Sequence, residues 1–299
     1  MGADLKWLGR TWLLPLIALA VLGFSASWGV AHLSGLKTWL ATLDTVEAGI
    51  LASLVAGLFT PVGALPVLLL RKISQRVEDS LMGFGAGIML AATAFSLAQP
   101  AIAEAVRLTG GMLSALLIVT LGITVGGLVI MAIERFLPHE HFALGKQSGA
   151  DVSKLRRIWL FIFAITIHNF PEGLAVGVGY GSGDIQAGLA LTLGIGLQNL
   201  PEGLIVALGL ISVGYGRAAA FGLAFLSGLV EPVGGTLGAV AVALAETLLP
   251  WGLAFAAGAM LFVISHEIIP ESHRQGHEGY ATMGVLAGFT VMLMLDATL

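Results

Sequence analysis

The chain has 299 residues, of which 57% are hydrophobic and only 11% charged, and its mean hydropathy is +0.94. A soluble globular domain carries about a quarter charged residues, so this composition excludes a chain whose whole surface faces water. The absence of cysteine excludes disulfides, thiolate metal sites and cysteine nucleophiles. The composition therefore predicts an all-α polytopic membrane protein whose partner is the lipid bilayer, with no nucleic acid, while the net charge of −4 adds little.

Nine apolar windows are long enough to cross a bilayer as a helix, which takes about 20 residues. They cover 11–30, 46–70, 80–100, 112–133, 158–180, 185–209, 218–243, 251–269 and 280–298. The last eight define an expected transporter core over 46–299, preceded by an N-terminal segment 1–45 that holds the first window and an outer loop. Residues 11–30 fit either a retained helix or a signal peptide, because basic residues precede them and small residues follow.

Basic residues are distributed very unequally between the two sides of the membrane. With nine spans, one side receives twelve Lys and Arg residues and the other only Lys37 and Arg107. Because cytoplasmic loops carry the excess of positive charge, the inner loop 135–157 is expected in the cytoplasm and the C-terminus outside. The expected location is the cytoplasmic (inner) membrane, with multiple passes.

Two short sequences recur at one fixed separation. Gly57–Gly63 (GLFTPVG) matches Gly228–Gly234 (GLVEPVG), and at the same separation GIML at 87–90 matches GAML at 258–261. The matched spans cross the membrane in opposite directions in the topology above. We therefore expect an inverted repeat, three helices, a central two and three more, as in many secondary transporters with a substrate site near the bilayer midplane.

The two central spans carry the same polar frame. HNFPEG occupies 168–173 and QNLPEG occupies 198–203, each close to the centre of its span, and Glu231 lies midway along a third span. A charged residue at the bilayer centre costs at least about 2.5–3.5 kcal/mol on insertion scales. No lysine or arginine lies at this depth, so a metal ion or protons must supply the countercharge.

The spacing within each frame favours a binding site. His168 and Glu172 are four residues apart and share a helix face, and Gln198 and Glu202 repeat the relationship. The prolines at 171 and 201 have no N–H, so the carbonyls of residues 167 and 197 lose their usual partner. Unpaired carbonyls at this depth are tolerated where they line a cavity or bind an ion.

These motifs resemble the fourth and fifth core helices of the ZIP (Zrt/Irt-like) metal transporters, with the QNLPEG frame closest to the bacterial GufA-like branch. The resemblance covers about 46–299 and implies a binuclear metal site, with zinc as the leading substrate and cadmium, iron or manganese as alternatives. It implies a first site made of Met89, His168, Glu172, Gln198 and Glu202. It implies a second made of Asn169, Glu172, Asn199, Glu202 and Glu231. Some family members have Asp where this chain has Asn199, so the second position is short of charge.

Three of these assignments compete with ordinary structural roles. A buried histidine such as His168 is usually hydrogen-bonded to a neighbouring helix, and Glu231 would also be stable as a protonated carboxyl. Methionine in an apolar helix usually packs, so Met89 rests on the resemblance alone. Further nitrogen and oxygen ligands near the cytoplasmic edge are expected to form an exit site or else to be solvated loop residues; they are His139, His141, His266, Glu267, Glu271, His273 and His277.

The sequence thus predicts transport of divalent metal ions, zinc first, across the cytoplasmic membrane into the cytosol. No enzyme activity and no cofactor other than the transported metal are expected, and a homodimer is one assembly that the sequence allows. An intramembrane zinc-dependent hydrolase is an alternative, although the chain lacks the HExxH motif and has one mid-membrane histidine. A proton or cation antiporter is another, but it leaves His168 and Gln198 unexplained.

Overall fold

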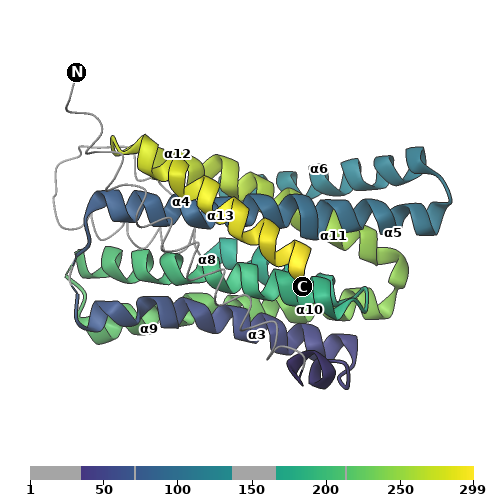
Figure 1. Cartoon of the computed structure of the whole chain (residues 1–299), viewed down its shortest axis with the longest axis horizontal. Helices are drawn as coiled ribbons and strands as arrows, with labels where there is room; N and C mark the ends of the chain where they lie inside the picture. The colour runs from purple at the N-terminus through teal and green to yellow at the C-terminus, as the bar shows by residue number, and fades with distance from the viewer. Residues whose placement is uncertain (1–34, 71, 137–165, 213) are drawn as a thin grey trace.

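The computed structural model describes residues 35–70, 72–136, 166–212 and 214–299, and within these ranges every regular element is a helix. The long helices lie side by side along the long axis of the molecule (Figure 1). Seven helical stretches are long and apolar enough to cross a membrane: Thr45–Leu68, Gln75–Thr109, Met112–Ile133, Ile185–Ser212, Arg217–Leu244, Glu246–His273 and Glu278–Thr298. Residues 166–180 are also helical. The all-α polytopic fold class is confirmed, while span 11–30 and residues 158–165 lie outside the described ranges.

The first half of the bundle contains three membrane-length helices. Helix α3 (Thr45–Ala64) continues into the short η1 (Leu65–Leu68). Helix α4 (Gln75–Ala91), the π-helical η2 (Ala92–Ala98) and α5 (Gln99–Thr109) form one continuous stretch, which is longer than the predicted window 80–100. Gly110 ends it with a left-handed φ of 69°, and α6 (Met112–Phe136) returns.

The last part of the chain, from residue 185 on, contains four membrane-length helical stretches. Helix α8 (Ile185–Ser212) is followed by α9 (Arg217–Gly228) and α10 (Val230–Leu244), which meet at Leu229. Helix α11 (Leu249–Val263), after the short η3 (Glu246–Leu248), continues through the π-helical η4 (Ile264–Ile268) into α12 (Ile269–His273). Helix α13 (Glu278–Thr298) completes the chain.

The predicted inverted repeat is visible where α3 crosses the α9–α10 junction. A Cβ on Gly57 would collide with the carbonyl oxygen of Gly228, and a Cβ on Gly228 would collide with the carbonyl oxygen of Gly57. This reciprocal contact places a pseudo-two-fold axis between the first glycines of the two matching sequences. Only glycine allows the two backbones to approach so closely.

The same axis exchanges the two central helices. Gly63 of α3 faces the carbonyl of Leu200 in α8, and Gly234 of α10 faces the carbonyl of Phe170 in helix 166–180. Each contact is the image of the other, because 63 and 234 are related by the repeat and 170 and 200 occupy the same place in the two polar frames. The four helices α3, 166–180, α8 and α9–α10 therefore form one pseudo-symmetric unit.

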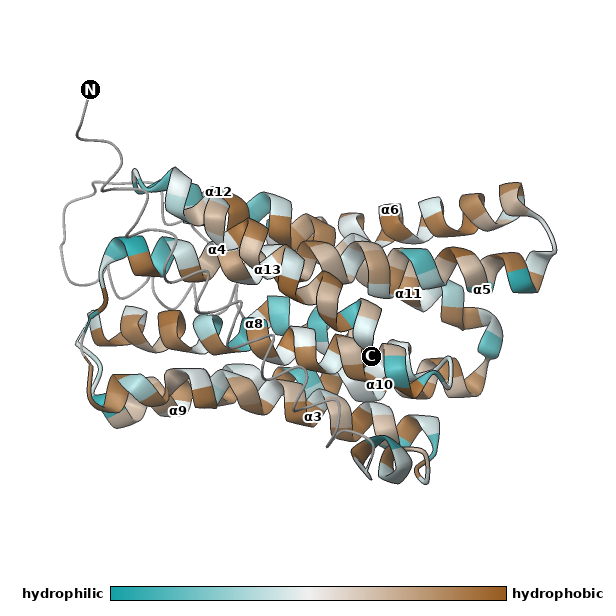
Figure 2. Ribbon diagram, in the orientation of Figure 1, coloured by the Kyte–Doolittle hydropathy of each residue, from teal (hydrophilic) through white to brown (hydrophobic). Residues whose placement is uncertain are grey.

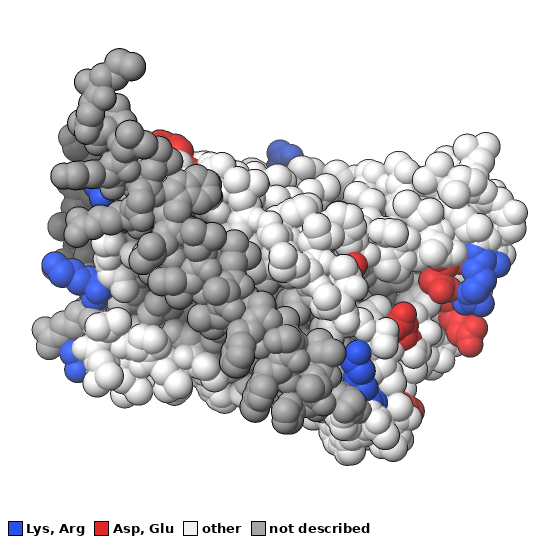
Figure 3. Space-filling model, in the orientation of Figure 1, with Lys and Arg blue, Asp and Glu red and all other residues white. Residues whose placement is uncertain are grey.

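The remaining helices form a second group. Helix α13 packs along α4, and α11 packs along α6, while α4 supplies the largest contact with α8 of the first group. Hydrophobic residues dominate the helices, and hydrophilic ones appear at helix ends and again part-way along α8 (Figure 2). On the face drawn in Figure 3, most visible charged side chains lie toward the two ends of the long axis. Such a distribution fits a bundle that spans a bilayer.

Candidate metal centre

The two Pro-Glu-Gly segments are held against the crossing of α3 and α10 by close backbone contacts. Gly173 faces the carbonyl oxygen of Glu231, and Gly203 faces the carbonyl oxygen of Thr60, at distances that leave no room for a Cβ. Pro201 lies inside α8 without ending it. The glutamate that precedes each of these two glycines is thereby held at the pseudo-two-fold axis, deep in the bundle.

The structure buries the whole predicted central set of polar residues. Apart from Glu202, which is half-buried, each is at most 6% exposed: His168, Asn169, Glu172, Gln198, Asn199 and Glu231. Polar side chains are rarely buried unless they are hydrogen-bonded, paired or bound to a metal. The hydrogen-bond and ion-pair partners of these side chains therefore indicate whether the centre can bind a metal ion.

The two asparagines anchor the motif helices to the repeat helices. The Asn169 Nδ2 donates to the carbonyl of Ser227 at 2.9 Å, and the Asn199 Nδ2 donates to the carbonyl of Ala56 at 2.9 Å. Ala56 and Ser227 each directly precede the first glycine of the two matching sequences, so the two bonds are images of each other under the pseudo-two-fold. Neither carbonyl could be predicted from the sequence, because no side-chain pattern marks a backbone acceptor.

The carboxylates are the least satisfied groups of the centre. Within the described ranges, both oxygens of Glu172, one of Glu202 and one of Glu231 are buried without a hydrogen-bond partner, as is the Oδ1 of Asn169. None of the ion pairs in those ranges includes any of these three glutamates. Each unsatisfied buried oxygen is unfavourable, and a cation between them would supply the missing partner.

His168 links the centre to the second helix group. Its Nε2 lies 3.1 Å from the Oε2 of Glu267, in the π-helical η4. A carboxylate next to a histidine fixes the orientation of the ring, as is common around metal-binding histidines. Glu267 was predicted at the exit, and the structure instead brings it to the central set.

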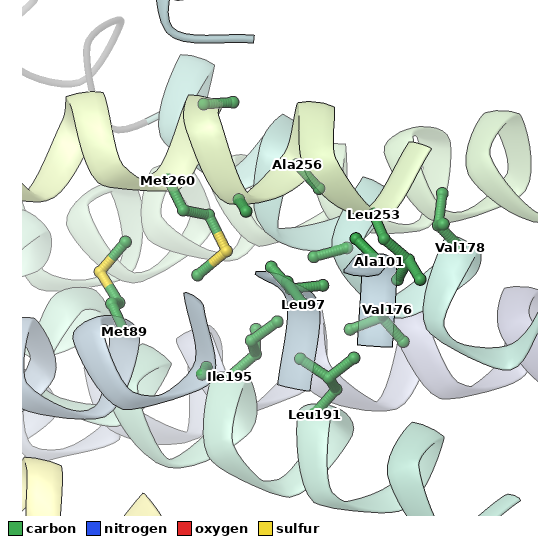
Figure 4. Close-up of a cluster of buried hydrophobic side chains, with 14 of the residues drawn as sticks. Met89, Leu97, Ala101, Val176, Val178, Leu191, Ile195, Leu253, Ala256 and Met260 are labelled. Carbon is green, nitrogen blue, oxygen red and sulfur yellow. The ribbon is translucent and has the colours of Figure 1, made fainter. Parts of the chain in front are cut away.

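Met89 is buried in an apolar cluster on the α4 side of the centre, 1% exposed, with Leu97, Ile195 and Met260 nearby (Figure 4). Met89 and Met260 are the methionines of the matching GIML and GAML sequences, so they are images of each other in the repeat. The surroundings of Met89 fit packing, and the thioether is the one soft donor of the predicted set.

The predicted exit residues each contact a different neighbour. His266 stacks on Phe262, with ring centroids 5.0 Å apart, and Glu271 pairs with Arg274. His273 contacts Thr282 through its Nε2 at 3.1 Å. His139 and His141 lie outside the described ranges.

The last of the exit residues, His277, lies beside an acidic residue that was not among the predicted ligands. Its Nδ1 is 3.0 Å from the Oδ2 of Asp79, a fully buried residue that also accepts from Gln75 at 2.8 Å. The polar character of the first turn of α4 was the available signal, since Gln75 and Asp79 share a helix face.

The donor set suits zinc, although its carboxylates are not gathered around one point. Across the parts of the chain that the structure describes, no three His, Asp or Glu side chains converge closely enough to hold an ion between them. The buried donors are imidazole nitrogen, carboxylate oxygen and amide oxygen, which match the preferences of zinc and other divalent first-row metals. The unpartnered oxygens of Glu172, Glu202 and Glu231 are available to turn toward an ion.

Comparison with known proteins agrees with this chemistry. Residues 145–296 match the family model described as ZIP zinc transporter. Over 253 residues the chain is 48% identical to the zinc transporter GufA of Myxococcus xanthus, across 84% of this chain and 99% of that protein. The chain belongs to the ZIP family. The family resemblance drawn from the two Pro-Glu-Gly frames is thereby confirmed.

Other ZIP proteins align over most of their lengths as well. The zinc transporter ZIPB of Bordetella bronchiseptica is 41% identical over 303 residues, covering 100% of this chain and 98% of that protein. Human zinc transporter ZIP11 is 34% identical over 320 residues, covering 80% of this chain and 94% of that protein. The similarity to ZIP proteins thus extends well beyond the two motif helices.

Proposed function

We propose that this ZIP protein carries divalent metal ions, zinc first among them, across the cytoplasmic membrane into the cytosol. One ion is bound at mid-membrane by His168, Glu172, Gln198 and Glu202, with Met89 as a soft donor from α4. The observation that carries the proposal is the group of buried carboxylate oxygens at the pseudo-two-fold axis that have no partner within the described ranges. The names of the aligned ZIP relatives supply the choice of zinc.

The route to the cytosol follows from the positions of the other polar residues. Glu267 contacts His168 on one side and is next in sequence to His266, while His277 and Asp79 lie further toward the inner end of α4 and α13. These groups form a stepwise series of nitrogen and oxygen ligands between the centre and the predicted cytoplasmic side. Movement of the pseudo-symmetric unit against the second helix group would alternate access, as inverted repeats allow.

The rival functions account for less of the centre. A hydrolase would need several histidines and an open metal position for water, whereas His168 is the one histidine of the predicted central set. A proton antiporter would use the carboxylates alone and would give no role to the buried amides. Metal binding also predicts proton release, because the ligands must be deprotonated to bind.

Zinc flux into proteoliposomes tests the proposal. Purified protein carrying Glu172→Gln or Glu202→Gln should lose most of its uptake, since each change removes a charged oxygen ligand while keeping the shape of the side chain. Glu246→Gln is the matched control, because Glu246 is exposed and lies in η3, just after the end of α10. This variant should transport zinc as the parent does. Uptake that is unchanged in both central variants would contradict the proposal.

A further inference from the structure

The buried side chain of Asn199 uses both of its N–H donors in hydrogen bonds, and its oxygen accepts a third. Its Nδ2 has two hydrogens, and it donates to the carbonyl of Ala56 at 2.9 Å and to the Oε1 of Glu231 at 2.7 Å. Its Oδ1 accepts from the Nε2 of Gln198 at 3.0 Å. Both partners of Nδ2 are acceptor oxygens, one of a carbonyl and one of a carboxylate, so the orientation of the amide follows from its partners.

The nitrogen end of the amide therefore faces Glu231, where the family resemblance implies a second metal ion. Amide groups bind metal ions through oxygen and not through the N–H side. A hydrogen bond of 2.7 Å to a carboxylate lies in the range of charge-assisted bonds, which are about twice as strong as neutral ones. The partial positive charge of the N–H thus stands next to Glu231 where a cation otherwise would.

The mirror-related asparagine shows that this contact is specific to Asn199. Asn169 makes the corresponding bond to a repeat-helix carbonyl, that of Ser227, but the residue related to Glu231 by the repeat is Thr60. Within the described ranges the Oδ1 of Asn169 has no partner. Backbone anchoring is therefore the shared role of the two amides, and holding a carboxylate is the additional role of Asn199.

We propose that Asn199 is a positioning residue whose carboxamide fills the second metal position, so that the centre of this chain holds one ion and not two. The inference rests on the proposed function, since it concerns the same centre. Glu231 is then held away from the ion by its bond to Asn199. The oxygens of Glu172 and Glu202 serve the single ion, together with His168 and Gln198.

X-ray absorption spectroscopy of the zinc-loaded protein tests the inference directly. The parent chain should show a shell of nitrogen and oxygen ligands and no zinc–zinc scattering. Asn199→Asp has the same shape but replaces the two N–H donors by a second carboxylate oxygen, so it should acquire zinc–zinc scattering at the separation of two-metal sites, about 3.5–4 Å. Bound zinc per chain, measured by elemental analysis, should rise by one ion in the same variant.

Two matched variants exclude a mere effect of charge. Asn169→Asp adds the same charge on the mirror-related helix, without a contact to Glu231, and should show no zinc–zinc scattering. Glu231→Gln combined with Asn199→Asp should remove the scattering that Asn199→Asp introduces. Zinc–zinc scattering in the parent chain, or equal gains in both aspartate variants, would overturn the inference and leave the proposed function standing. A parent spectrum that is the same as that of Glu172→Gln with Glu202→Gln would overturn both.

Discussion

At the scale of single residues, the centre consists of side chains that hold one another in place before any ion binds. Asn199 donates a hydrogen bond to Glu231, and Gln198 donates one to Asn199. Glu267 contacts the imidazole of His168. Preorganised ligands lower the cost of binding because fewer side chains must be ordered when the ion arrives. Unpartnered oxygens remain on Glu172, Glu202 and Glu231, and those of Glu172 and Glu202 belong to the groups proposed to bind the ion.

The contact between His168 and Glu267 leads to a prediction about affinity. Glu267→Gln keeps the shape of the side chain but weakens its hold on the imidazole, and loss of such an outer partner typically lowers metal affinity by about 10–100-fold. Zinc titration of the purified protein, by calorimetry or by competition with a chelating dye, measures the change. An unchanged dissociation constant would show that the 3.1 Å contact does not orient His168 for binding.

The pH dependence of binding is a second prediction at this scale. Imidazole and carboxylate groups bind zinc only when they are deprotonated, so zinc affinity should fall as the solution becomes more acidic. Proton release on addition of zinc, followed with a pH indicator in weak buffer, measures the same linkage. The variant Glu172→Gln with Glu202→Gln should release fewer protons than the parent, and equal release would place the binding elsewhere.

Most of the central residues were predictable from sequence, whereas their partners were not. Charged and amide side chains in the middle of an apolar span are conspicuous, so His168, Glu172, Asn199 and Glu202 could be identified directly. The acceptor of Asn199 is the carbonyl of Ala56, 143 residues away in sequence, and no periodicity encodes such a contact. Glu267 was assigned to the exit because its distance from His168 depends on how two helices pack.

At the scale of the elements, the position of each motif helix depends on glycines that face backbone. Gly203 of α8 lies against the carbonyl oxygen of Thr60, and Gly173 lies against that of Glu231. Adding a methyl group at either position forces the motif helix away from the backbone of α10 or α3 that it touches. Overpacking of a well-packed site costs about 1–3 kcal/mol, and more where the neighbour is rigid backbone.

Alanine substitutions test this packing. Gly203→Ala should lower the midpoint of thermal unfolding in detergent, or abolish expression of folded protein, because its Cβ would overlap the Thr60 carbonyl. Gly222→Ala in α9 is the matched control, since nothing lies within 4 Å of its Cβ and alanine is the better helix former. Equal thermal stability of the two variants would mean that α3 and α8 are not packed as described.

Hydropathy predicted the spans well but could not predict interruptions within them. The predicted window 218–243 corresponds to two helices, α9 and α10, that meet at Leu229, and the window 80–100 to a stretch that continues to Thr109. Hydropathy windows end where polar residues begin, yet a helix continues as long as its backbone bonds do. The π-helical segments at 92–98 and 264–268 keep an apolar composition, so they too are invisible to such a window.

At the scale of the whole molecule, the orientation in the membrane remains a prediction from the distribution of basic residues. The absence of cysteine from the chain makes it directly testable. Ser182→Cys lies in the exposed turn before α8, and Gln275→Cys lies in the exposed turn before α13, at the opposite ends of the bundle. In intact cells an impermeant maleimide should label the first and not the second, and the reverse pattern would invert the topology.

The two π-helical segments also occupy matching places in the repeat. When the two halves are aligned with Gly57 on Gly228, η2 (Ala92–Ala98) falls on 263–269 and includes η4 (Ile264–Ile268). A π-helical turn contains more residues than the α-helical turn it interrupts, which is what an inserted residue produces in a helix. One extra residue at the same place in each half accounts for both segments. The irregular turns are thus a shared property of the two halves and not a peculiarity of one helix.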